Sequence, residues 1–386
     1  MLIRSIPFAL LCFLPLFAQE PGSFEMDILG SYYDQDGENS PVNGGIGSEE
    51  LSSASPIIVL RYATEKWLFS ANLGFDNVTS ASIDAMDDNR PAGLVLPESE
   101  YDEEDYENGY NVSSASRMDN RAFAIFSASR AFGNNNITFS AGFSKEYDYT
   151  SVNGGIGWSR NFNGNNTTLG VNLHHYQDSI DLYNIHGINE GSDDRTTTDF
   201  SISMSHIFTP KAAGSIELFA SDQSGFLSSP FQEVILDDGT HVTERLPDNR
   251  LRTGVRLALN YAWTERLIHR NSLRYYDDDF GIDALTLEQE LHFRVSESTW
   301  IYPIVRFHQQ GGSDYFGLPR TFTATDTYYT ADRDLSEFDS TKLGLGASWS
   351  RDGRFLKGID VRLTYYDRDD GLNSFNISFG TRWSLR

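Results

Sequence analysis

The chain is almost free of cysteine and has no long apolar run. Its only cysteine is Cys12, near the start, and Leu11 stands where a lipidated cysteine needs a small residue before it. If the first residues are removed, no cysteine remains, which excludes disulfides and thiolate metal sites. No later segment approaches the roughly 20 apolar residues of a transmembrane helix, and this excludes a helical membrane protein.

The first eighteen residues read as a secretory signal. They contain Arg4, a short apolar core and a small residue, Ala18, at the end. Pro7 and Pro15 interrupt the apolar run, so an uncleaved anchor is the weaker interpretation. We expect cleavage after Ala18. Because no linker or change of composition divides the remainder, we expect residues 19–386 to form one domain.

From Phe24 onward the sequence alternates apolar and polar residues in about sixteen stretches. In the last stretch Phe375, Ile377 and Phe379 alternate with Asn376, Ser378 and the glycine that follows. A period of two with one apolar face is what a lipid-facing strand needs. A soluble β-sandwich or propeller also alternates and is the alternative interpretation.

The connections between these stretches are alternately short and long. The short ones are 64–65, 132–135, 163–165, 209–212, 264–265, 296–298 and 351–354. The others are 35–55, 77–119, 149–150, 178–195, 225–249, 277–283, 311–338 and 369–372. Bacterial outer-membrane barrels have short periplasmic turns and long extracellular loops. The sequence therefore predicts an all-β transmembrane antiparallel barrel in the bacterial outer membrane, with both termini periplasmic.

Acidic residues outnumber basic ones, 55 to 30. The excess lies in the links on the long side, whereas the strands are slightly basic. Nucleic acid is an improbable partner for such a surface. We expect contacts with outer-membrane lipid and lipopolysaccharide and with the barrel-assembly machinery, and the sequence names no partner protein. No cofactor is expected, although Ca²⁺ or Mg²⁺ could bind loosely at acidic loops, with Asp34, Asp36 and Glu38 as weak candidates.

The polar face of the C-terminal half is charged and would line the lumen. Its candidate selectivity residues are Arg256, Arg274, Glu288, Glu290, Arg294, Lys342, Arg362 and Arg382, with His292 among them. The N-terminal half instead offers Ser140, Gly142, Asn153, Gly155, Asn172 and Ser203. A basic wall would favour anionic solutes. The alternative, which we favour, is that Arg and Glu pair across strands and hold the shape of the barrel.

The histidines do not indicate catalysis. His174 and His175 are adjacent, so they point to opposite faces of a strand, and the others are scattered singly. A serine, histidine and acid set cannot be assigned from spacing alone. We expect a protein that is not an enzyme.

Several irregular segments occur in a fixed order along the chain. They are residues 145–151, 166–169, 225–234, 244–250, 274–282 with Thr286 and Glu288, 306–310 with Tyr315 and Phe316, and 328–336. In this order they resemble the bacterial family known as domain of unknown function 3570. The resemblance covers roughly residues 120–386 and implies an outer-membrane β-barrel without supplying a substrate.

The family-like segments cluster at the predicted strand tops and outer loops. Phe226 and Phe231 would be costly to leave in water, so we expect residues 225–250 to pack over or into the mouth. The candidate mouth residues are Phe226, Pro230, Phe231, Asp277, Asp278, Asp279, Asp332 and Arg333. The leading hypothesis is a porin-like channel or transporter for a small solute. The competing one is a non-conducting barrel whose loops bind a ligand or scaffold a secreted redox or maturation partner.

Overall fold

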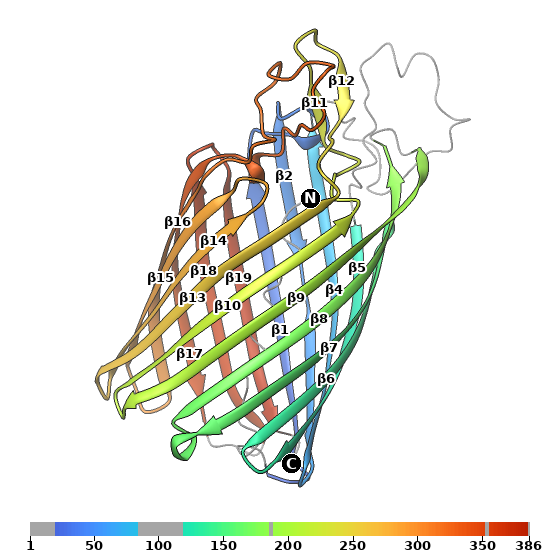
Figure 1. Cartoon of the computed structure of the whole chain (residues 1–386). Helices are drawn as coiled ribbons and strands as arrows, with labels where there is room; N and C mark the ends of the chain where they lie inside the picture. Colours follow the sequence, from blue (N-terminus) through green and yellow to red (C-terminus); the bar gives the residue numbers. More distant parts are fainter. Residues whose placement is uncertain (1–19, 84–118, 185–187, 352–354, 385–386) are drawn as a thin grey trace.

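The alternating segments form one closed antiparallel sheet (Figure 1). The computed structural model describes residues 20–83, 119–184, 188–351 and 355–384. Within them seventeen strands are hydrogen-bonded in chain order, and β1 pairs with β19 to close the sheet. β2 and β3 are halves of one strand, because both pair with β1 and with β4 on either side of Ser55 and Pro56. The predicted barrel of sixteen strands is confirmed.

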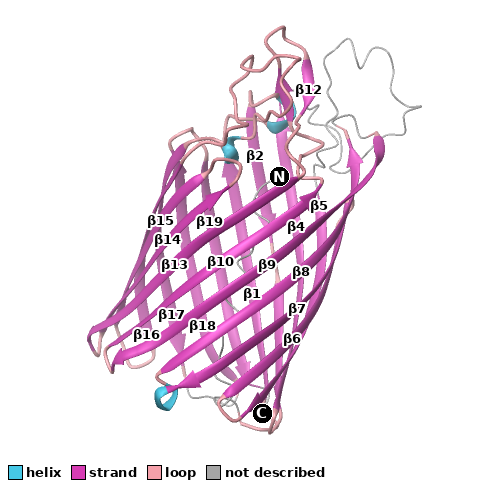
Figure 2. Cartoon of the chain, viewed as in Figure 1, coloured by secondary structure: helices cyan, strands magenta, loops and turns pink. Residues whose placement is uncertain are grey.

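Strands make up nearly all of the ordered structure (Figure 2). The wall consists of β1 (Phe24–Asp36), β2 (Ser48–Ala54), β3 (Ile57–Ala63), β4 (Trp67–Ile83), β5 (Asp119–Phe132), β6 (Asn135–Lys145), β7 (Tyr149–Phe162), β8 (Thr167–Tyr183), β9 (Asn189–Thr209), β10 (Ala212–Gly225), β13 (Asn249–Thr264), β14 (Leu267–Asp278), β15 (Asp283–Arg294), β16 (Thr299–Gln310), β17 (Phe338–Ser350), β18 (Leu356–Arg368) and β19 (Asn373–Ser384). Outside it lie the hairpin β11 (Glu233–Ile235) and β12 (His241–Thr243) and the 3₁₀ turns η3 (Pro41–Asn43), η5 (Asn163–Asn165) and η6 (Arg333–Leu335). No helix in the described part of the chain is long and apolar enough to span a membrane.

The two ends of the barrel differ as the sequence predicts. At one end, which we call the turn end, consecutive strands are joined by residues 64–66, 133–134, 163–166, 210–211, 265–266, 295–298 and 351–355. At the other, which we call the loop end, lie the links 226–248 and 311–337, close to their predicted limits. Because no long link falls at the turn end, the predicted parity of the connections is correct.

Other loop-end links were predicted too long. The link predicted at 35–55 is 37–47, the one predicted at 178–195 is 184–188, and the one predicted at 277–283 is 279–282. The brief link predicted at 149–150 lies at 146–148. β9, for example, begins at Asn189 and includes Asp193 and Asp194. Backbone pairing needs no apolar face, so strands continue into water after their alternation stops. The predicted link 77–119 falls mainly outside the described residues, although β4 continues to Ile83.

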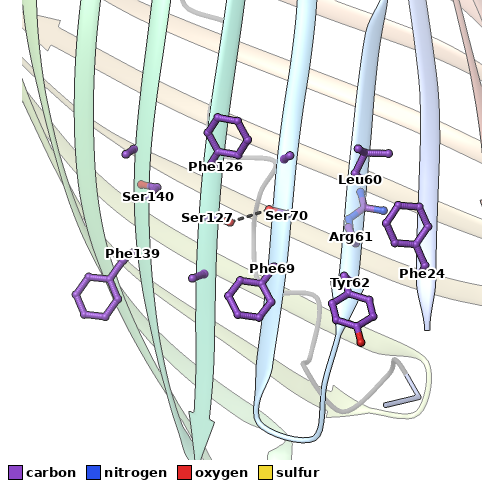
Figure 3. Close-up of a pocket in the computed structure, with 13 residues that line it drawn as sticks. Phe24, Leu60, Arg61, Tyr62, Phe69, Ser70, Phe126, Ser127, Phe139 and Ser140 are labelled. Carbon is purple, nitrogen blue, oxygen red and sulfur yellow. Dashed lines mark hydrogen bonds between the residues drawn. The ribbon is translucent and has the colours of Figure 1, made fainter. Parts of the chain in front are cut away.

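The outer face of the wall is apolar and uncovered. Leucine, isoleucine and phenylalanine side chains stand exposed on every second position, as a lipid-facing band requires. A hollow of about 480 Å³ lies in this outer face where alanines on β4 to β6 are flanked by Phe69, Phe126 and Phe139 (Figure 3). The hydrogen bond of 2.7 Å between Ser70 and Ser127 lies on the opposite face of the same strands. The hollow is therefore part of the lipid-facing surface, and the polar chemistry faces inward.

Candidate functional site

The inner face of the wall is polar, and its two halves differ in charge. The small neutral residues predicted for the N-terminal half lie side by side, since Ser140 pairs with Gly155 and Gly142 with Asn153. The C-terminal half carries the charges. Three inward arginines, Arg382, Arg270 and Arg362, have side chains 58%, 51% and 40% exposed. Because these side chains remain uncovered, the described residues do not fill the lumen near the turn end.

Two of the predicted selectivity residues belong to an ion-paired group near the turn end. Arg362 Nη1 lies 3.3 Å from Glu290 Oε1, and Arg362 Nε lies 3.2 Å from Asp360 Oδ1. His292 Nε2 lies 2.6 Å from Glu290 Oε2. Arg270 Nη1 approaches the same carboxylate at 3.9 Å. Arg362 is therefore ion-paired with Glu290 and Asp360 and is not a free lumen charge.

Tyr302 fixes this group to the wall. Its ring is 1% exposed and stacks on His292 with the ring centroids 4.2 Å apart. Its hydroxyl donates to Asp360 at 2.5 Å. Gly346 pairs with Tyr302 across the sheet, and a Cβ at this glycine would stand 2.1 Å from the ring. The absence of a side chain at Gly346 is thus what lets the tyrosine lie flat against β17.

Two further candidates are also engaged. Arg382 Nε lies 3.2 Å from Asp27 Oδ1, and Arg61 Nη1 lies 2.9 Å from Asp27 Oδ2, so one buried carboxylate on β1 serves both neighbouring strands. Arg294 donates to the carbonyl of Glu297 in the turn 295–298. Neither position leaves an unpaired charge in the middle of the lumen.

Four cations on the loop-end half of the inner wall form a different arrangement, which we call the basic belt. It comprises Arg256, Arg274, Arg306 and Lys342. Arg256 stands directly opposite Arg274, and Arg306 directly opposite Lys342. Among the described residues none of the four forms a salt bridge within 4.0 Å, in contrast to Arg362 and Arg382. Like charges facing each other across strands destabilise a sheet, so this arrangement is not explained by holding the barrel together.

Acidic residues flank the belt without pairing with it. Glu217 on β10 stands opposite Arg256, and Glu288 on β15 stands opposite Arg306. Across neighbouring strands the inward residues are therefore one acid followed by two bases, first Glu217, Arg256 and Arg274, and then Glu288, Arg306 and Lys342. Each of these two groups has one excess positive charge. Arg306 was missed as a candidate, although the outward apolar residue after it, Phe307, gave the signal.

Arginine and aspartate also pair near the tops of the hairpins at the loop end. In each case the arginine lies over an aromatic ring. The sets are Arg121, Asp76 and Phe123; Arg195, Asp178 and Tyr149; Arg250, Asp278 and Phe280; and Arg368, Asp370 and Phe338. The first three pairs join neighbouring strands, whereas Arg368 and Asp370 lie at the end of β18 and in the link that follows it. Of these residues only Asp278 is among the candidates predicted from the sequence.

Asp278, predicted as a mouth residue, is one of these structural aspartates. Its carboxylate accepts from Arg250, from the Tyr276 hydroxyl at 2.6 Å and from the backbone N–H of Phe280 and Ile282, both at 3.0 Å. It thereby closes the link 279–282. Its neighbours Asp277 and Asp279 are exposed.

Residues 226–248 and 311–337 fold together above the loop end, and we call them the cap (Figure 1). One apolar cluster joins the cap to the wall through Leu246, Leu335, Phe280 and Ile282. A second lies within the cap, where Val234 of β11 packs against Tyr329 and Ala331. Backbone hydrogen bonds connect the two segments in both directions between Arg245 and Tyr329.

The other candidate mouth residues lie in the cap. Phe226, Pro230 and Phe231 are half-buried. Asp332 accepts from the N–H of Asp334 at 2.9 Å and begins η6, and the Arg333 guanidinium lies 5.7 Å from the Phe316 ring centroid. These contacts shape the cap, and they place Asp332 close to two further carboxyl groups, those of Glu244 and Asp334.

One carboxyl group of the cap, that of Glu244, is buried, and a second, that of Asp334, is partly buried. Burial, together with the nearby Asp332, raises the pKa of Glu244 to about 8. Its oxygens accept from the Ser229 N–H at 2.6 Å and contact the Thr330 hydroxyl. Burial and Asp332 also raise the pKa of Asp334 to about 6, while Arg368 opposes the rise. The cap is therefore built around carboxyl groups that are costly to ionise.

The weak cation candidates do not converge. Asp34, Asp36 and Glu38 are all exposed, and Asp34 accepts a hydrogen bond of 3.0 Å from Tyr32. Within the described ranges no group of three or more histidine, aspartate or glutamate side chains could hold a metal ion.

Comparison with known proteins agrees with the fold. A family model described as "Protein of unknown function (DUF3570)" matches residues 18–380. A search of curated proteins finds no match. Among solved structures, a bacterial polysaccharide outer membrane secretin aligns with a TM-score of 0.50 and 12% identity over 95% of this chain and 100% of the secretin. At such identity the likeness shows an outer-membrane barrel fold and no more.

Two other solved barrels are less similar. A mutant of the TodX monoaromatic hydrocarbon channel has a TM-score of 0.47 and 11% identity over 97% of this chain and 93% of the channel. A mutant ferric enterobactin receptor from Pseudomonas aeruginosa has a TM-score of 0.45 and 11% identity over 91% of this chain and 54% of the receptor.

Proposed function

The chain belongs to the DUF3570 family of proteins of unknown function, and we propose that it is an outer-membrane channel for small anionic solutes. The observation that carries this proposal is the basic belt. Its four cations face the lumen, and none of them forms a salt bridge with a described residue. Fixed charges along a pore select the ions that enter it, and low-dielectric walls focus their field.

The basic belt changes which residues we hold responsible for the preference for anions. The sequence suggested Arg256, Arg274, Arg294 and Arg362 as the source of anion preference. Arg362 is neutralised by Glu290 and Asp360, and Arg294 lies at the turn end. We assign the preference to Arg256, Arg274, Arg306 and Lys342 instead.

The cap lies above this region and would control entry. Its two apolar clusters and the hydrogen bonds between Arg245 and Tyr329 support a folded cover rather than two independent loops. The same packed cap favours the second candidate function, a non-conducting barrel that binds a ligand or a partner protein there.

Single-channel conductance of the purified protein in planar bilayers tests the proposal. We expect discrete steps whose chloride current falls when Arg256 and Lys342 are both changed to glutamine. A variant with both Arg270→Gln and Arg294→Gln is the matched control, because it also removes two positive charges but does so near the turn end. A protein that gives no steps would overturn the channel and support the second candidate.

We place the loop end outside the cell and the turn end in the periplasm, by analogy with the loop lengths of bacterial barrels. In this orientation lipid surrounds the apolar band, lipopolysaccharide contacts the loop end, and the barrel-assembly machinery inserts the chain. The expected absence of cysteine after the leader makes the test simple. In intact cells a membrane-impermeant maleimide should label Asp238→Cys in the cap and spare Asn134→Cys in a short turn. The reverse result would invert the orientation.

A further inference from the structure

Three arginines surround one glycine on the inner face of β13 and β14. Arg252, Gly254 and Arg256 occupy successive inward positions of β13, and Arg274 stands opposite Arg256. The Nε atom of Arg252 is buried and has no hydrogen-bond partner among the described residues. Because that atom is closed to solvent while Arg252 as a whole is only half-buried, an anion in the lumen would reach this side chain through its terminal N–H groups.

The local charges leave two of the arginines uncompensated. Arg252 pairs in register with Asp278, but the Asp278 carboxylate is already held by Arg250 and the link 279–282. Arg256 faces Glu217 across the sheet. Arg274 faces Thr286 on one side and Arg256 on the other. A further acid at this level of the wall, Asp199, lies on β9, with β10 between it and Arg252. Two excess positive charges therefore remain, those of Arg252 and Arg274.

Aromatic rings hold Arg274 in place. Its guanidinium lies 4.9 Å from the Phe219 centroid and 5.8 Å from the Tyr276 centroid. The Phe219 ring lies over Gly254, where a Cβ would come within 2.4 Å of it. Cation–π contacts orient a guanidinium without using its N–H donors. Those donors stay available on a side chain that is already positioned.

We propose that Arg252, Arg256 and Arg274 form a binding site for a dianionic oxyanion of the phosphate class. The inference rests on the proposed passage of anions and names the class of solute that the lumen prefers. Guanidinium groups bind phosphate oxygens through paired N–H bonds, and the two uncompensated charges match a dianion. A monovalent anion would satisfy only one of them.

Isothermal titration of the folded barrel in detergent at low salt tests the site, with inorganic phosphate as the probe and chloride as the competitor. We expect phosphate to bind at least tenfold more tightly than chloride. Arg252→Gln and Arg274→Gln should each weaken phosphate binding at least tenfold, and Arg252→Lys should weaken it less because it keeps the charge. Arg270→Gln is the matched control, since Arg270 lies on the same face of β14 towards the turn end.

Gel migration that changes on heating would confirm that each variant is folded before titration. Phosphate binding no tighter than that of chloride would overturn the inference, as would an equal loss in Arg270→Gln and Arg274→Gln. Conductance separates this result from the proposed function. If the protein conducts anions but does not bind phosphate, the proposed function stands and the phosphate site is refuted. If it binds phosphate but gives no conductance, the site stands and the proposed function is refuted.

Discussion

Glu244→Gln should make the stability of the cap less dependent on pH. The carboxyl group lies in the protein interior, and burial together with Asp332 raises its pKa to about 8 from an ordinary value of 4.5. Glutamine resembles the neutral acid. Its amide oxygen can accept from the Ser229 N–H, and its amide nitrogen can donate to the Thr330 hydroxyl oxygen.

The sign follows from proton linkage. When the cap opens, Glu244 regains its ordinary pKa and releases its proton above about pH 4.5, whereas in the closed cap it stays neutral up to about pH 8. The stability of the cap is therefore full below pH 4.5 and falls as the pH rises towards 8, by about 1.4 kcal/mol per pH unit. Between pH 6 and 8 the loss should reach about 2 to 3 kcal/mol. Asp334, whose pKa is raised to about 6, contributes mainly below this window.

Amide hydrogen exchange in the β11–β12 hairpin measures this free energy. The Glu244 N–H, bonded to the Gln232 carbonyl at 2.7 Å, reports opening of the cap once intrinsic exchange rates are corrected for pH. The wild-type opening free energy should decline between pH 6 and 8, and that of Glu244→Gln should stay nearly constant. Equal slopes in the two proteins, or a wild-type cap that becomes more stable as the pH rises, would refute the reasoning.

Four further substitutions, in two matched pairs, test the wall. Tyr302→Ala should lower the free energy of unfolding by about 3 to 5 kcal/mol, because it empties the space over Gly346, while Tyr302→Phe should cost only about 1 kcal/mol since Asp360 is partly exposed to solvent. Urea unfolding in micelles measures both, and equal losses would contradict the packing argument. Asp278→Asn should cost about 3 kcal/mol because it leaves Arg250 without its charged partner, whereas the exposed neighbour Asp279→Asn should cost under 0.5 kcal/mol. If Asp279→Asn were as costly as Asp278→Asn, the assigned role of Asp278 would be wrong.

The fold was largely predictable because lipid and lumen impose a period of two on every strand. Strand number, closure and the placement of short turns follow from that period and from the turn residues. Strand ends at the loop end were not predictable, since β8 and β9 continue by backbone pairing through Asp193 and Asp194, where no apolar face marks them.

The inward direction of the candidate charges was also predictable from alternation, but their pairing was not. Which residue stands opposite Arg256 depends on the register of β10 and β14, and alternation fixes only the face. Hence Arg362 and Arg382 looked equivalent to Arg274 until Glu290 and Asp27 were found beside them. Arg252 and Arg306 were missed although their exposed apolar neighbours Leu251 and Phe307 place both on the inner face.

The zero-current potential across a salt gradient tests the central claim most directly. One side contains about 0.01 M potassium chloride and the other contains ten times more. On the dilute side the Debye length is roughly 30 Å, so the fixed charges of the lumen act on ions over that distance. The sign of the potential should show chloride as the more permeant ion, and changing Arg256, Arg274, Arg306 and Lys342 to glutamine should move it towards zero. A potential that shows potassium preference, or one that the fourfold variant leaves unchanged, would contradict the account.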